Sequence, residues 1–504
     1  MDIGIWNLLG IILIIAIIIG VGIYSGRMVS DASDFDTGGG KAGPWIVCGA
    51  IMGSLVSGQA TIGTAQLAFE YGMSAWWFTL GSGIGCLILA IGYVIPLRHS
   101  GSITLLEVIG KEYCAKAEYT GSVLCSIGIF ISVIAQVLSS CALLTAIFHM
   151  DFLVAAVLSV VIMMIYVVFG GAWGAGMGGV VKLVLLYGAS ILGLGIVLTN
   201  SHGAGALIDQ LRSTLGGTDM GSLAGLLTAE DVSGRYLSLF SRGFLKDMGS
   251  GLSLLLGVLA TQTYAQAIWS AKSDSKARKG AMLSALLIPP IGIACIFIGM
   301  FMRNHCLTTA EITALTEAGK SIPEGMIEIA STSQVFPTFV MHYMPKFIGG
   351  IVLGTLLVTV IAGGAGLSLG VATILVNDIF CKISKGLADV KKKLYTTRLT
   401  IVATLCLAAA IALVVPGAII NDFGFLSMGI RGTVVFIPLS CALFAKGKVA
   451  PWAVLVSMAA GPVAVLGGNL LGLPFDSLFL GIFVCLVIIG IGVISQKKQK
   501  KINV

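Results

Sequence analysis

The sequence predicts an all-α polytopic membrane protein. Of its 504 residues, 57% are hydrophobic and only 11% are charged, which is far more apolar than a soluble domain. Apolar runs of about 20 residues, the length that crosses a bilayer as a helix, recur along the chain and are separated by short polar segments. The lipid bilayer is therefore the expected environment of most of the chain.

Hydropathy places about 13 transmembrane helices along the chain. The first apolar run lacks the basic start and the cleavage pattern of a signal peptide, so we expect it to remain as a helix. The expected helices cover residues 5–24, 45–67, 75–97, 120–147, 151–172, 180–199, 247–270, 279–302, 346–376, 398–415, 418–444, 449–471 and 476–495.

The basic residues predict the orientation of these helices. Most of the 30 Lys and Arg residues lie in alternate segments, including 381–397 and the C-terminal tail. Because cytoplasmic loops are the ones enriched in Lys and Arg, we expect a plasma-membrane protein with its N-terminus outside and its C-terminus in the cytoplasm. The net charge of +7 then reflects topology, and no nucleic-acid partner is expected. Segment 381–397 either fixes topology or binds a lipid or partner.

The order of the helices indicates a single transmembrane domain over residues 1–504. Counted along the chain, helices 2–6 and 7–11 form two groups of five that enter the membrane from opposite sides, at about residues 45–199 and 247–444. This is the arrangement of an inverted repeat, with one extra helix before it and two after it. The long loops 200–246 and 303–345 are expected to contain short surface helices.

A series of loop and helix motifs resembles one known family. The motifs are an acidic-aromatic-glycine lead-in from Ser33 to Lys41, the segment Ser57 to Gly63 followed by Tyr71-Gly72, the junction Phe169 to Trp173, the segment Gln266 to Lys272 with Ala277-Arg278, and Val335 to Pro337 with Met344-Pro345 before a helix ending at Asp378-Ile379. Their order and spacing over residues 30–470 resemble the sodium:solute symporter family.

This resemblance implies a transporter of the LeuT type, working by alternating access, with a midplane site where helices 2 and 7 unwind. Independently of the family, small and hydroxyl residues around Gly53, Gly58 and Gly63 would weaken helix 2 where a broken helix frees carbonyls for a cation or solute. Close packing of helices through small residues is the alternative interpretation.

The chain departs from the family at the expected sodium site. The resemblance assigns backbone carbonyls at Gly53 and Val56 and hydroxyls at the positions of Ala362 and Gly363, which have none. Where the family carries Thr-Asp-x-x-Gln on helix 6, this chain has Gly178 to Lys182. We hypothesise that Lys182 replaces bound sodium and couples transport to protons, or permits exchange or facilitated transport. The alternative is that Lys182 extends to the cytoplasmic interface.

A second charge, Arg431, lies about midway through helix 11 and needs a compensating partner. Either backbone carbonyls and water satisfy it, or an anionic solute does. Amides and hydroxyls on other helices, each of which could instead bond between helices, complete the expected binding site for a small polar solute. The expected binding residues are Gln59, Thr61, Gln136, Thr261, Gln262, Tyr264 and Arg431.

Other classes of protein have less support in the sequence. The glycine-rich stretches do not form a phosphate-binding loop, and the five histidines lack metal-ligand spacing, so neither an enzyme, a metal centre nor a bound cofactor is expected. Na+ or H+ remains as a coupling ion. A pore would need a repeated selectivity filter. A membrane sensor that works with a separate partner protein remains the alternative function.

Overall fold

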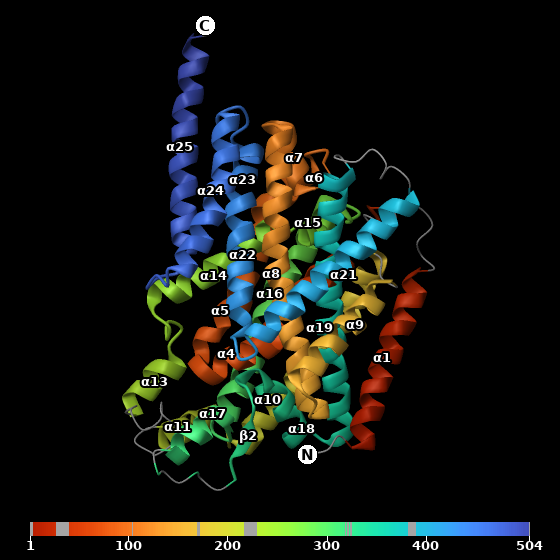
Figure 1. Ribbon diagram of the computed structural model, residues 1–504, viewed down its shortest axis with the longest axis vertical. Helices are drawn as coiled ribbons and strands as arrows, with labels where there is room; N and C mark the ends of the chain where they lie inside the picture. The colour runs from red at the N-terminus through yellow and green to blue at the C-terminus, as the bar shows by residue number, and fades with distance from the viewer. Residues whose placement is uncertain are drawn as a thin grey trace.

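The computed structural model describes residues 4–26, 40–102, 104–168, 172–215, 229–317, 319, 322, 325–381 and 390–502. The lead-in motif at 33–39 and the junction at 169–171 lie outside these residues, as do residues 382–389 of segment 381–397. Within the described part, nearly every ordered segment is helical, and the helices form one elongated bundle (Figure 1). Two short strands are the exception.

Each expected span coincides with a helix or a chain of helical segments. Nine helical stretches of the described residues are long and apolar enough to cross a membrane, or ten if one bent pair counts as a single span, and one of the nine, Gln59–Arg98, runs through two of the expected spans. The spans are α1 (Ile5–Gly26), α3 (Pro44–Leu55) with η2 (Gln59–Gly63) and α4 (Thr64–Tyr71), α5 (Trp77–Ile88) with η4 (Leu89–Tyr93) and α6 (Val94–Arg98), α8 (Ala115–Phe148), α9 (Phe152–Val168), α10 (Ala172–Asn200), α14 (Phe244–Leu259) with α15 (Gln262–Trp269), α16 (Asp274–Arg303), α19 (Lys346–Ile374), α21 (Val390–Val414), α22 (Ile420–Arg431) with η8 (Gly432–Phe436) and α23 (Ile437–Phe444), α24 (Pro451–Leu470), and α25 (Leu478–Ile502).

Shorter elements fill the connections. The two long loops contain short helices, as expected, but also a small parallel pair of strands that the sequence analysis did not predict. Helices α11, α13 and α17 gather with β2 at one end of the bundle, which we call the loop end; α6 and α7 lie at the opposite end (Figure 1). The shorter elements are η3 (Gly72–Trp76), α7 (Leu105–Glu112), α11 (Ala204–Leu215), α13 (Ala229–Leu237), β1 (Cys306–Thr308), α17 (Thr309–Glu317), β2 (Ile327–Ile329), η5 (Thr332–Gln334), α18 (Val335–Tyr343) and η6 (Leu375–Phe380).

Two spans are broken near their middles. Helix α3 ends at Leu55, because Val56 adopts an extended conformation with φ −82° and ψ 90°, and the chain resumes as the π-helical turn η2. Helices α14 and α15 meet at a 44° bend at residues 260–261. A break inside a span releases backbone carbonyls and N–H groups that a continuous helix would pair. The helices predicted to unwind are therefore the ones that break.

Glycines set the close approach of the helices around the broken span α3. A Cβ on Gly179 of α10 would lie 2.0 Å from the Gly49 carbonyl oxygen of α3, so the two backbones touch at this level. Helix α8 runs beside α22 and contacts η2, the turn that follows the break in α3, and its most apolar stretch is 83% buried. The broken segments therefore face the interior of the protein rather than lipid.

Replacing Gly179 with Ala should separate α10 from α3, because the methyl group would strike the Gly49 carbonyl. We expect a loss of about 1–3 kcal/mol, measured as a lower midpoint of thermal unfolding in detergent. Gly178→Ala is the matched control, since nothing lies within 4 Å of its Cβ position and both variants gain the same helix propensity. Equal midpoints for the two variants would contradict the close approach.

Candidate functional site

The break in α3 exposes the Gly53 carbonyl, which accepts a hydrogen bond from Lys182. Lys182 lies on α10, one turn beyond Gly179, and its Nζ donates a hydrogen bond of 2.7 Å to the Gly53 carbonyl oxygen. The side chain is only 6% exposed. The last carbonyls of a helix carry a partial negative charge, so the end of α3 favours a cation at this point. The ammonium group is thus directed into the protein rather than to an interface.

No carboxylate neutralises Lys182 within the described ranges, because none of the ion pairs found there includes it. Its positive charge is held by a backbone carbonyl. A sodium ion would need several oxygen ligands around the same position. The Gly53 carbonyl, expected to be one of them, already accepts a hydrogen bond from the amine.

Helix α19 lies against the same break but contributes no side-chain oxygen at the expected positions. A Cβ on Gly363 would lie 3.3 Å from both the Gln136 Oε1 atom and the Ser57 Cβ atom, which places Gly363 beside the unwound residues. Ala362 is half-buried, and the Val56 side chain is 1% exposed. The structure thus places Gly363 of α19 beside the break in α3, with no hydroxyl on either Ala362 or Gly363.

Gln136 of α8 binds the unwound residues directly. Its Nε2 donates to Ser57 Oγ at 2.8 Å, and its Oε1 accepts from the Gly58 N–H at 3.3 Å. The break therefore has a fixed polar partner. Thr61, which was expected to face solute, donates its hydroxyl to the Ser57 carbonyl oxygen at 3.0 Å.

Arg431 ends helix α22 beside the second break and is 2% exposed. Its Nη1 donates to Thr261 Oγ1 at 2.9 Å, and its Nη2 donates to Ser132 Oγ at 3.3 Å and Ser427 Oγ at 3.0 Å. Weaker contacts reach the Ser427 carbonyl oxygen at 3.3 Å and Met428 Sδ at 3.2 Å. All these partners are neutral, and no ion pair among the described residues includes Arg431.

The remaining predicted residues differ in their surroundings. Gln59 is 4% exposed, and its Nε2 has no hydrogen-bond partner among the described residues, although it lies against Gly424 of α22. Tyr264 is 3% exposed and packs in the core. Gln262 accepts a hydrogen bond from the Leu105 N–H at 2.9 Å, which ties its amide to the start of α7 rather than to Arg431.

Ser427 is the contact that the sequence analysis missed. It bonds both to Arg431 and to the Gly128 carbonyl oxygen of α8. It lies one helical turn before Arg431, and Ser132 lies one turn before Gln136, so the spacing of these serines was the available signal. A π-helical turn begins directly after Arg431, and another begins at Gln59, as is frequent at functional sites.

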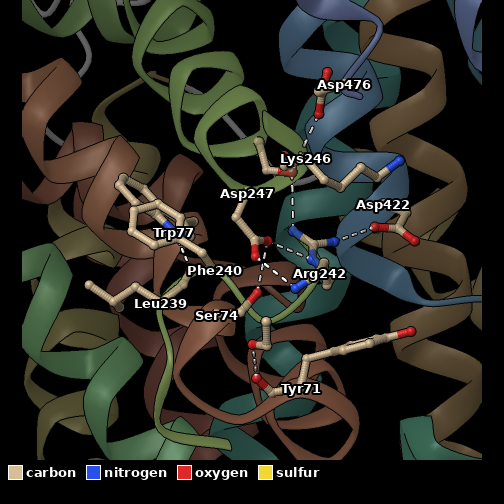
Figure 2. A network of polar contacts seen from close by, with 12 residues as sticks. Tyr71, Ser74, Trp77, Leu239, Phe240, Arg242, Lys246, Asp247, Asp422 and Asp476 are labelled. Atoms are coloured by element: carbon tan, nitrogen blue, oxygen red, sulfur yellow. Dashed lines mark hydrogen bonds and ion pairs between the residues drawn. The ribbon is translucent and has the colours of Figure 1, made fainter. Parts of the chain in front are cut away.

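A polar network closes the site toward the loop end (Figure 2). Arg242 pairs with Asp247 at 2.7 Å and with Asp422 at 3.1 Å, joining the start of α14 to the start of α22. The guanidinium also lies 5.2 Å from the centre of the Phe425 ring. Phe425 in turn packs on Phe78 at 5.7 Å, and Phe78 and Gln59 both lie against Gly424.

Further hydroxyls and a third carboxylate extend this network. Ser74 donates to Asp247 at 2.8 Å, while Ser250 contacts both Arg242 and Asp476 (Figure 2). Burial raises the pKa of the Asp476 carboxyl above its usual value. Asp247 has a fully buried side chain, so its pairing with Arg242 is the buried contact that holds this layer.

The opposite end is closed by contacts at the end of α15. Arg98 pairs with Asp274 at 2.6 Å and donates to the carbonyl oxygens of Ile268 and Ala271. A backbone bridge joins Ala42, just before α3, to Ala271. The two broken spans are thus tied to each other at this end, and the site between the two layers is buried.

Comparison with solved structures identifies this architecture. The chain superposes on the substrate-bound outward-open state of a Na+-coupled sialic acid symporter with a TM-score of 0.72, at 18% identity and with 98% of each chain covered. It also superposes on Mhp1, a nucleobase-cation-symport-1 family transporter in a closed conformation, with a TM-score of 0.51 at 12% identity, covering 93% of this chain and 96% of Mhp1. The fold is of the LeuT type.

The family follows from the sequence comparison. Residues 35–461 match the sodium:solute symporter family, and the chain belongs to that family of transporters, which are not enzymes. An uncharacterized symporter, YwcA of Bacillus subtilis (strain 168), is 24% identical over 398 residues, covering 77% of this chain and 71% of YwcA. The high-affinity choline transporter 1 of Drosophila melanogaster is 22% identical over 436 residues, covering 82% of this chain and 63% of the fly protein.

Replacing Asp247 with Asn should weaken the layer at the loop end, because Arg242 loses its fully buried partner. We expect the free energy of unfolding to fall by about 3 kcal/mol. This is the low end of the range for breaking a buried ion pair, because Arg242 keeps its second partner, Asp422. The control is Asp209→Asn, whose pairing with Arg212 is exposed and should contribute little. If thermal unfolding shows the two variants to be equally stable, Asp247 does not hold this layer.

Proposed function

We propose that this transporter carries a small polar organic solute by alternating access, with the Lys182 ammonium in the place of bound sodium. The observation that carries this proposal is the 2.7 Å hydrogen bond from Lys182 to the Gly53 carbonyl oxygen. An amine at this position supplies the positive charge that the end of α3 favours. It also donates to the oxygen that a sodium ion would need as a ligand.

The absence of hydroxyls at Ala362 and Gly363 supports the same conclusion. Sodium would lose two of about five oxygen ligands on the α19 side, while an ammonium needs only acceptors for its N–H bonds. Because Lys182 is fixed to the chain, the cycle needs no sodium gradient. It either releases a proton from the amine during each turn, which couples transport to H+, or keeps it and permits exchange or facilitated transport.

The proposed solute site lies between the two breaks, at the centre of two inverted repeats of about residues 45–199 and 247–444. Gln59 lies on η2, Gln136 on α8 and Arg431 on α22, while Thr261 lies in the break between α14 and α15. Their burial and their contacts with one another's helices support this location. The positive-inside bias supports a plasma-membrane orientation with the N-terminus outside and the C-terminus in the cytoplasm.

The relatives leave the solute open, because their names point to opposite charges. The fly protein is named as a transporter of choline, which is a cation, whereas the sialic acid symporter takes a solute that carries a carboxylate. The buried, uncompensated Arg431 would repel a quaternary ammonium ion held beside it. For this chain, a neutral or anionic solute therefore fits better than choline.

The sodium replacement has a test that needs no knowledge of the solute. The wild-type protein should show the same midpoint of thermal unfolding in about 100 mM NaCl as in KCl. A triple variant, Lys182→Ala with Ala362→Ser and Gly363→Ser, frees the Gly53 carbonyl and adds two hydroxyls. If it binds sodium with a Kd of about 10 mM, NaCl should stabilise it by about 1.4 kcal/mol.

Lys276→Ala, which removes an exposed lysine, is the control and should behave like the wild type. Sodium-specific stabilisation of the wild-type protein would count against the replacement.

Uptake of radiolabelled organic acids, amino acids and sugars into vesicles tests transport itself. We expect saturable uptake and counterflow without a sodium gradient. Binding without uptake would instead favour the sensor.

A further inference from the structure

We propose that the transported solute is an organic anion, and that Arg431 holds its carboxylate at the break between α14 and α15. This inference rests on the proposed function, because it names the class of solute for that site. Two observations on the residues around α22 support it independently. They are the uncompensated charge of Arg431 and a buried amide donor with no partner.

The first observation concerns charge. A guanidinium stays protonated in proteins, and a buried charge in a membrane protein is normally paired. The hydroxyls and the sulfur around Arg431 satisfy its N–H groups but leave its charge uncompensated. A carboxylate could replace two of the longer contacts, those at 3.3 Å to Ser132 and to the Ser427 carbonyl, with a bidentate pair.

The backbone next to Arg431 carries a partial positive charge, the same sign as the guanidinium. Helix α15 starts at Gln262, directly after Thr261, and the N-terminus of a helix carries a partial positive charge. Thr261 caps this helix without a side-chain hydrogen bond to it. Its hydroxyl instead donates to the Gly257 carbonyl oxygen at 2.6 Å and accepts from Arg431. Two positive features side by side repel each other, and an anion between them removes that repulsion.

The second observation is the amide of Gln59. It lies against Gly424, seven residues before Arg431 on α22, so both groups approach the same side of that helix about two turns apart. The amide is buried, and its Nε2 has no partner among the described residues. A buried donor without an acceptor is costly, so this position suits a hydroxyl or carbonyl oxygen of the solute.

Lys182 is not an equivalent anchor for an anion. Its ammonium bonds to a carbonyl at the negative end of α3, whereas Arg431 lies beside the positive end of α15. The local backbone therefore compensates the charge of Lys182 and reinforces that of Arg431. Of Lys182 and Arg431, only Arg431 has surroundings that favour an incoming anion.

Matched acids and amides test the inference on the purified full-length protein. The probes are lactate, pyruvate, succinate, gluconate and glutamate against lactamide, pyruvamide, succinamide, gluconamide and glutamine, with tetramethylammonium as a cation. Binding is read from thermal unfolding and from isothermal titration calorimetry. We expect at least one acid to bind and its amide to bind at least tenfold more weakly, since only the acid pairs with the guanidinium. Tetramethylammonium should not bind.

Variants then assign the effect to Arg431. Arg431→Gln should abolish the preference for the acid over its amide, while Arg431→Lys keeps the charge and should retain part of it. Arg398→Gln is the control, because Arg398 is an exposed residue of α21 and should leave the preference unchanged. If Arg431→Gln does not fold, the acid and amide comparison on the wild-type protein still decides the question.

The outcomes separate this inference from the proposed function. Equal binding of acids and amides, or no binding by any acid of the panel, would overturn the anionic class. An acid preference without any uptake into vesicles would leave the anion site standing and overturn transport. Saturable uptake of a neutral or cationic solute that Arg431→Gln does not alter would overturn the anion site and leave transport standing.

Discussion

The contact between the Lys182 ammonium and the Gly53 carbonyl is the interaction on which the site depends. The break in α3 leaves a carbonyl with partial negative charge inside an apolar bundle, and such a group needs a donor or a cation. Here a covalently attached cation meets that need. The close approach of α10 at Gly179 makes the contact possible, because it brings the stem of Lys182 beside α3. In the proposed function, this contact stabilises the break in place of a dissociable ion.

At the second break, the adjacent helix end is positive, whereas at the first break it is negative. The start of helix α15 lies beside Arg431. The neighbouring hydroxyls accept hydrogen bonds from the guanidinium but do not compensate its positive charge. Layers at both ends close over this region, through Arg242 with its carboxylates and through Arg98 with the end of α15. In the proposed alternating access, these layers would open in turn. The layer at the loop end rests on the ion pairs of Arg242, and the other rests on the Arg98–Asp274 pair and the bridge between Ala42 and Ala271.

Much of the fold could be predicted from the sequence, and less of the site could. Bilayer crossing demands long apolar runs, so hydropathy located every span, and small residues near Gly53 and Gly58 indicated the break in α3. The paired strands at Cys306 and Ile327 and the helix at Leu105 are too short for periodicity to reveal. Gln262 was expected to face the solute, but its partner at Leu105 is distant in sequence. Likewise, Ser427 carried no signal except its spacing from Arg431.

Equilibrium binding of radioactive 22Na+ to the purified protein tests the central claim most directly. With Lys182 bonded to the Gly53 carbonyl, the wild-type protein should show no saturable binding that unlabelled sodium displaces. Saturable, displaceable binding of sodium to the wild-type protein would contradict the account.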